Sequence, residues 1–90
     1  MAQPNVIKRA LRVRNKLGLH ARPAALFVQI ANKYDAEISV KKGRQLVNGK
    51  SIMGIMMLAA SRGSKICIIA KGDDAQEAVA DLERLVRSRE

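Results

Sequence analysis

The 90-residue sequence contains one histidine, His20, which lies in the run GLHARPAA at residues 18–25. A neutral imidazole is both a nucleophile and a base near pH 7. No second histidine, paired cysteine or acidic cluster accompanies it, so the sequence offers neither a metal-ligand set nor a catalytic triad. If a side chain of this protein carries out covalent chemistry, His20 is the best candidate.

The residues after His20 predict a helix that begins near Ala21, because apolar residues recur at three-and-four spacing as far as Ala31. Pro23 in the first turn costs little, since backbone N–H groups there lack partners. A phosphoryl group on His20 Nδ1 would meet the N–H groups of Ala21 and Arg22 and the Arg22 guanidinium. The same positive field favours a neutral imidazole. The alternative is that His20 only caps the helix and that Arg22 is an ordinary solvated arginine.

The run Gly49-Lys50-Ser51 ends like a nucleotide-binding phosphate loop, but that loop requires a glycine where this sequence has Arg44. Nucleotide hydrolysis is therefore not predicted. Ser51 instead precedes a short apolar helix expected over residues 52–60, and a serine at that position is a sufficient N-cap. On position alone, Ser51 needs no further role.

The helix after Ser51 carries more apolar residues than one face of a short helix can bury. We expect part of that surface to remain exposed as a docking patch for partner proteins, made by Ile52, Met53 and Met56. Flexible methionines suit a surface that must fit several partners. The competing interpretation is that all these residues belong to the core, and the same helical periodicity supports it.

Alternation and turn signals predict the order strand, helix, strand, strand, helix, strand, helix. The expected strands lie at residues 7–13, 37–41, 44–48 and 65–71, and Asp73 is expected to cap the last helix, with Gln76 completing a capping box. Arg9 breaks the apolar face of the first strand. The order predicts an α+β fold in which helices cover one face of a four-stranded, mainly antiparallel sheet. The length predicts one domain over residues 1–90.

The net charge of +9 is placed unevenly, with 11 Lys and Arg against two carboxylates in residues 1–50 and six of each sign in residues 51–90. This asymmetry indicates attraction to an anionic partner. A basic nucleic-acid-binding module is one such class. Against it, the chain has only two aromatic residues for base stacking and no zinc-ligand pairs.

Cys67 is the only cysteine and lies in an apolar run, so we expect a structural, buried thiol and no disulfide within the chain. The N-terminal residues lack the apolar stretch of a secretory signal, and no segment is long enough to span a membrane. These features predict a cytoplasmic protein.

The run GLHARPAA and the run NGKSIMG at residues 48–54 resemble the two motifs of HPr, the histidine-containing phosphocarrier protein of the bacterial phosphotransferase system. The resemblance extends from about Ile7 to Val86. It implies an open-faced β-sandwich with three helices, His20 as the phosphoacceptor, Arg22 as its phosphate partner and Ser51 as a regulatory serine. It also implies a carrier that needs no metal or cofactor.

The implied partners are Enzyme I as the donor, charged from phosphoenolpyruvate, and IIA domains as acceptors. A kinase of the HPr kinase/phosphorylase type would modify Ser51 in bacteria that possess one. A monomer is expected. Family members are usually nearer neutral, so the charge of +9 leaves the partners open. A nitrogen-branch regulatory paralogue has the same fold and histidine and is the alternative.

Overall fold

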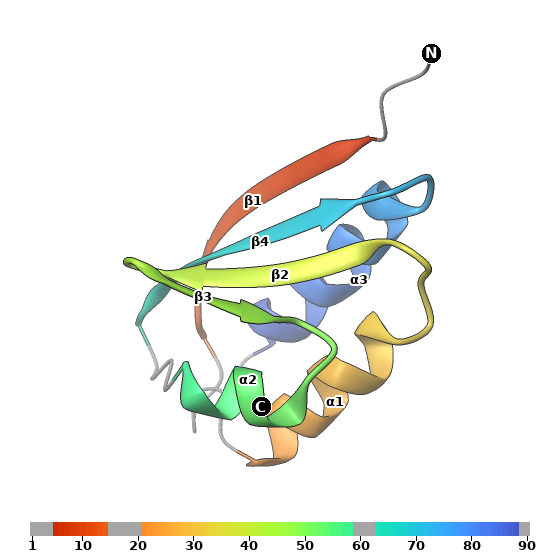
Figure 1. Cartoon of the computed structure of the whole chain (residues 1–90). Helices are drawn as coiled ribbons and strands as arrows, with labels where there is room; N and C mark the ends of the chain where they lie inside the picture. Colours follow the sequence, from red (N-terminus) through yellow and green to blue (C-terminus); the bar gives the residue numbers. More distant parts are fainter. Residues whose placement is uncertain (1–4, 15–20, 59–62, 89–90) are drawn as a thin grey trace.

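The computed structural model describes residues 5–14, 21–58 and 63–88. Three helices and four strands follow one another in the predicted order (Figure 1). Their bounds are β1 Val6–Arg12, α1 Ala21–Ala31, β2 Glu37–Lys42, β3 Gln45–Asn48, α2 Ile52–Met57, β4 Lys65–Lys71 and α3 Ala75–Arg87. The helix predicted over residues 52–60 is shorter, because α2 ends at Met57 with Leu58 as its C-cap. Residues 59 and 60 lie outside the described residues.

The four strands form one sheet in the order β1-β4-β2-β3, and every neighbouring pair is antiparallel. The β2–β3 hairpin turns at Gly43, whose φ of 60° lies in the left-handed region that glycine adopts without strain. In the central strand β4, Ala70 lies opposite Ile7 of β1 and Ile38 of β2. This register places the apolar residues of three strands on one face.

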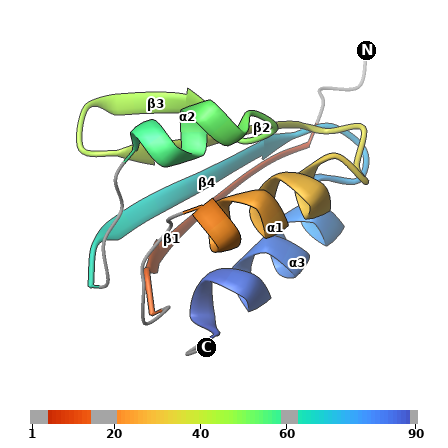
Figure 2. The ribbon, with the colours of Figure 1, turned by 90° about the horizontal axis from the view of Figure 1, so that it is seen from below.

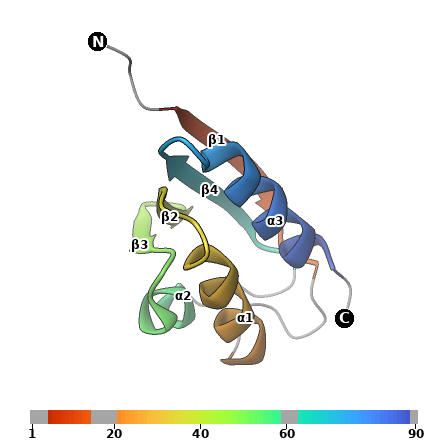
Figure 3. The same cartoon turned by 90° about the vertical axis from the view of Figure 1, so that its right-hand side faces the viewer.

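All three helices cover that face, as Figures 2 and 3 show, and the opposite face carries no helix from the described part of the chain. The predicted α+β fold, an open-faced sandwich, is therefore confirmed. The core lies between the two layers, with Phe27 of α1, Ile55 of α2 and Leu82 of α3 fully buried. The predicted stripe of α3 is buried throughout, at Ala75, Ala78, Val79, Leu82 and Val86. Within the described ranges, every helix is too short or too polar to span a membrane.

Strand β4 corrects the expectation for Cys67. Ile66, Ile68 and Ala70 point toward the helices and are buried, whereas Cys67 and Ile69 alternate with them and are only half-buried on the uncovered face. The continuous apolar run of β4 in the sequence suggested that both faces of this strand are buried. Only one face is covered by helices, so the thiol of Cys67 is not in the core.

The start of α3 differs from the predicted capping box. Asp74, not Asp73, occupies the N-cap, and its side chain makes no cap hydrogen bond. The Asp74 carboxylate instead accepts from the backbone N–H groups of Asp35 and Ala36, each at 2.9 Å. The Asp74 side chain thus binds the loop before β2 instead of capping its own helix.

Arg9, the exception on the apolar face of β1, has a partner across the layers. Its guanidinium donates to the carboxylate of Glu83 on α3. Since β1 is an edge strand, this side chain can lie along the helix and keep its charge at the surface.

Candidate functional site

Helix α1 begins at Ala21, directly after His20 in the chain. His20 itself lies outside the described residues, so its role as phosphoacceptor stays a prediction, and so does donation from the N–H groups of Ala21 and Arg22. Pro23 is buried in the first turn, as expected for a residue that needs no backbone donor there. The first turn of α1 contains no acidic residue. The helix start therefore keeps its partial positive charge.

The Arg22 side chain is exposed and forms no ion pair with any residue that the structure describes. A guanidinium in this state loses no existing contact when it binds an anion, and it can offer two parallel donors to a phosphoryl group. The combination of exposed Arg22 with a first turn that holds no acidic residue favours an oxyanion at this end of α1.

Ser51 is the N-cap of α2. Its backbone is extended, with φ −114° and ψ 119°, and its Oγ accepts from the N–H of Gly54 at 3.1 Å. The N–H of Ile55 donates to the Ser51 carbonyl at 3.0 Å, which closes the first turn. The predicted capping role is therefore confirmed, whereas regulation through this hydroxyl remains a prediction.

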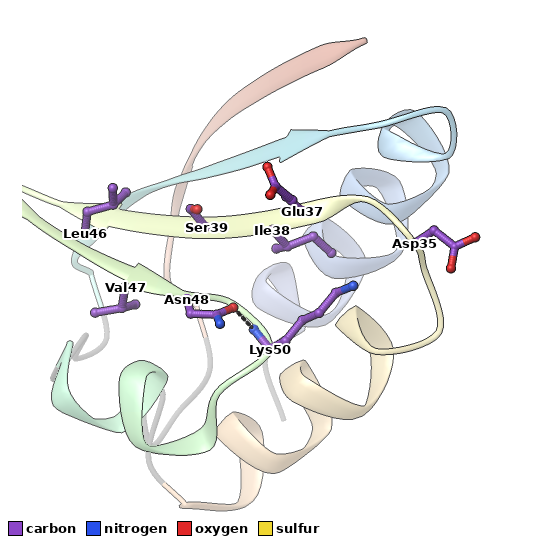
Figure 4. Close-up of a pocket in the computed structure, with 8 residues that line it drawn as sticks. All are labelled: Asp35, Glu37, Ile38, Ser39, Leu46, Val47, Asn48 and Lys50. Atoms are coloured by element: carbon purple, nitrogen blue, oxygen red, sulfur yellow. Dashed lines mark hydrogen bonds between the residues drawn. The ribbon is translucent and has the colours of Figure 1, made fainter. Parts of the chain in front are cut away.

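The segment before Ser51 is held by hydrogen bonds that the sequence alone does not predict. The N–H of Gly49 donates to the Ile38 carbonyl at 2.7 Å, and the N–H of Lys50 donates to Asn48 Oδ1 at 2.9 Å (Figure 4). Lys50 Nζ donates to the Tyr34 carbonyl at 2.7 Å, which ties the segment to the chain just after α1. In the sequence, the Asn48-Gly49 pair is the signal that predicts a turn here. These contacts fix where α2 begins.

A hollow of about 470 Å³ lies beside this segment, at the end of the β2–β3 hairpin (Figure 4). Its lining mixes the carboxylates of Asp35 and Glu37 with the ammonium of Lys50. The hollow also includes Ile38, Ser39, Leu46, Val47 and Asn48. Within the described ranges, no group of three His, Cys, Asp or Glu side chains could hold a metal ion here or elsewhere.

Helix α2 divides its apolar residues between core and solvent. Ile55 and the C-cap residue Leu58 are buried, while the exposed fractions of Ile52, Met53 and Met56 are 46%, 70% and 44%. Met57 is exposed as well. Figures 1 and 2 show α2 lying beside α1, on which Leu26 is also exposed. The three predicted patch residues are thus exposed, and the interpretation that all of them belong to the core is wrong.

Tyr34 links the end of α1 to α3, since its hydroxyl donates to Asp81 Oδ2 at 2.6 Å. This hydrogen bond raises the pKa of Tyr34, and burial and the negative charges of Asp81, Glu77 and Asp74 raise it further. The neutral phenol is therefore the form that the fold stabilises.

The fold is a four-stranded antiparallel sheet with three helices on one face, and one helix starts directly after the only histidine. Together, this fold and this site define a class of small α+β proteins. The family model described as "PTS HPr component phosphorylation site" matches residues 7–88. The chain belongs to the HPr family.

Two curated relatives illustrate that similarity. The HPr-like protein Crh of Bacillus subtilis is 46% identical over 82 residues, covering 91% of this chain and 96% of the relative. The phosphocarrier protein HPr of Treponema pallidum is 40% identical over 84 residues, covering 93% and 96%. Among solved structures, HPr from Bacillus anthracis is 49% identical, with a TM-score of 0.87 over 90% of this chain and 96% of that one.

Proposed function

We propose that this HPr-family phosphocarrier accepts a phosphoryl group on His20 from Enzyme I and passes it to IIA domains of the sugar phosphotransferase system. The observation that supports this most is the family match over residues 7–88, together with a helix α1 that begins immediately after the single histidine. The protein acts as a carrier and not as a self-sufficient enzyme. No metal or cofactor enters the reaction.

In the proposed transfer, the lone pair of neutral His20 Nδ1 attacks the phosphorus of a donor phosphohistidine. The new N–P bond forms as the donor's N–P bond breaks, the His20 ring releases its Nε2 proton, and the donor imidazole takes up a proton. Arg22 and the start of α1 stabilise the negative charge of the phosphoryl group in the transition state, where electrostatic stabilisation matters most. The reverse sequence of steps delivers the group to an acceptor histidine.

The proposed docking surface is the exposed apolar patch of Ile52, Met53 and Met56. Its side chains come from the same short helix that Ser51 caps. Phosphorylation of Ser51 by an HPr kinase/phosphorylase would place a doubly charged group at the edge of this patch. We propose that the modification regulates docking. The similarity to Crh, whose solution structure is described as that of a catabolite repression HPr, supports a regulatory use of the chain in addition to transport.

We also propose that residues 1–90 act in the cytoplasm as one domain and as a monomer. Crh of Bacillus subtilis has been crystallised as an intertwined, domain-swapped dimer, so the oligomeric state requires a direct measurement. Light scattering on the purified full chain gives that measurement. A concentration-independent mass of one chain supports the monomer, and a stable mass of two chains contradicts it.

The transfer itself is tested by reconstitution. The purified chain, loaded with labelled phosphate by Enzyme I and phosphoenolpyruvate and then separated from both, is mixed with a IIA domain. The proposal predicts that label leaves the chain and appears on the IIA domain with equal stoichiometry. Stable retention of the label on the carrier in the presence of several different IIA domains would contradict the sugar branch, and delivery only to a nitrogen-branch IIA domain would favour the regulatory paralogue.

A further inference from the structure

Four cationic side chains from three segments line one hollow of about 280 Å³ at an edge of the sheet. Arg12 comes from β1, Arg14 follows β1, Lys65 begins β4 and Arg87 ends α3. We call these four residues the basic corner. Figures 2 and 3 show the C-terminal end of α3 beside the end of β1, and the N–H of Arg14 donates to the Val86 carbonyl at 3.2 Å. The structure also describes Ala10 and Leu11 in its lining.

The backbone fixes these cations close to one another. Arg12 lies directly opposite Lys65 in the antiparallel register of β1 and β4. The pairing continues past the strand end, where the N–H of Val13 donates to the Ser64 carbonyl at 2.9 Å. Like charges directly opposite each other in a sheet are destabilising. The arrangement therefore has an electrostatic cost that the sheet itself does not relieve.

Among the described residues, no carboxylate lines the hollow. Arg87 Nε lies 3.1 Å from Glu83 Oε2, but Glu83 also pairs with Arg9. Arg12 Nη1 donates to the neutral carbonyl of Gly63 at 3.1 Å. Arg12, Arg14 and Lys65 form no ion pair within the described part of the chain. The charges of Arg12, Arg14 and Lys65 are thus not neutralised by any residue that the structure describes, and an anion in the hollow would neutralise them.

We propose that the basic corner binds a small anion that carries two or more phosphate groups. Arginine side chains bind phosphate oxygens through paired donors, and Arg and Lys are both fully charged near pH 7. The three cations without a described ion pair, Arg12, Arg14 and Lys65, still exceed what a single phosphate neutralises, and the hollow is several times larger than the roughly 30 Å³ of one water molecule. No aromatic side chain from the described part of the chain lines it for base stacking, so a compact polyphosphate or bisphosphate fits better than a nucleic acid. This site uses no residue of α1 and goes beyond the phosphocarrier function.

Isothermal titration of the full chain with inorganic triphosphate, diphosphate and orthophosphate at constant ionic strength tests the proposal. We expect saturable 1:1 binding in which triphosphate binds at least tenfold more tightly than orthophosphate. The double variant Arg12→Gln/Arg14→Gln should weaken triphosphate binding tenfold or more. The matched control Lys33→Gln/Arg44→Gln removes the same charge from exposed residues outside the corner and should change the affinity less than twofold. Thermal melts verify that both variants are folded.

The variant His20→Ala distinguishes this site from the phosphoacceptor. It should bind triphosphate as the wild type does, even though it is expected to accept no phosphoryl group. Loss of binding in His20→Ala, equal weakening in the two double variants, or absence of saturable triphosphate binding would each overturn the proposal. Binding confined to duplex DNA or to vesicles containing phosphatidylserine would also overturn it and would indicate a macromolecular partner.

Discussion

The Arg22 side chain is exposed and forms no ion pair with any described residue. A substitution there can therefore affect phosphoryl transfer without affecting the stability of the fold. Arg22→Ala should therefore change the free energy of unfolding by no more than about 0.5 kcal/mol, as surface substitutions usually do. Phosphoryl transfer from Enzyme I should slow tenfold or more, since a charge-assisted contact to the moving group is lost. Rapid-quench kinetics measure this effect.

The matched control for Arg22 is Arg44→Ala, which removes one exposed cation from the turn between β2 and β3. It should leave transfer nearly unchanged. If Arg22→Ala and Arg44→Ala have the same rate as the wild type, the start of α1 alone is sufficient for transfer and the role assigned to Arg22 is wrong.

Tyr34 gives a prediction for the pH dependence of stability. Because its folded-state pKa is raised above 10.0, the neutral phenol and its hydrogen bond to Asp81 stabilise the fold below about pH 10. This contribution is lost as the pH rises through the folded pKa. The wild type should therefore be more stable than Tyr34→Phe from pH 7 to 9, and the difference should shrink above pH 10. Urea unfolding of both proteins across this range measures it; a difference that grows with pH would contradict the assignment.

At the scale of elements, Ser51 and the patch on α2 act as one unit. A carboxylate or phosphate at an N-cap is compatible with the helix, because it accepts from the N–H groups there and meets the positive end of the dipole. Docking, however, must remove water from the patch beside that charge. Ser51→Asp should therefore keep the melting temperature while raising the apparent KM for Enzyme I more than it lowers kcat.

The control for Ser51→Asp is Gln76→Glu, which adds the same charge at an exposed residue in the first turn of another helix, α3. It should leave KM unchanged. Equal KM values for Ser51→Asp and the wild type would refute the docking mechanism, and so would a collapsed melting temperature of Ser51→Asp.

The segment between β3 and α2 depends on a close backbone approach at Gly49. A Cβ at this position would lie 2.5 Å from Ile38 Cγ2 and 3.0 Å from the Ile38 carbonyl oxygen. Gly49→Ala should destabilise the fold by about 1–3 kcal/mol, as overpacking of a buried position does. Gly43→Asn is the control, since its position has open space and asparagine tolerates a positive φ. Denaturant unfolding compares the two; similar stabilities of Gly49→Ala and the wild type would show that this segment shifts freely.

For the whole molecule, the sequence predicted the order of all seven elements, since helical and alternating periodicities record which side of each element faces the core. The misses share a different cause. The exposure of Cys67 depends on which sheet face the helices leave uncovered, and the absence of a side-chain cap at Asp74 depends on a loop nearly 40 residues earlier. Such non-local contacts leave no periodic signal.

The candidate site shows the same division. The cap at Ser51 and the exposed residues of α2 follow from local pattern and were predictable. The bond from Lys50 to the Tyr34 carbonyl and the gathering of four cations in the basic corner arise only when distant segments fold together. Two of the eleven cations in the first half of the sequence, Arg12 and Arg14, lie in this corner beside Lys65 and Arg87 from the second half.

The most direct test of the central claim is the phosphate stoichiometry of His20→Ala. The wild-type chain, incubated with phosphoenolpyruvate and Enzyme I, should acquire one acid-labile, alkali-stable phosphate, measured by intact-mass spectrometry at alkaline pH. His20→Ala should acquire none while it melts at the same temperature as the wild type. An equal phosphate load on His20→Ala, or its absence from the wild type, would contradict the assignment of this protein as a phosphocarrier acting through His20.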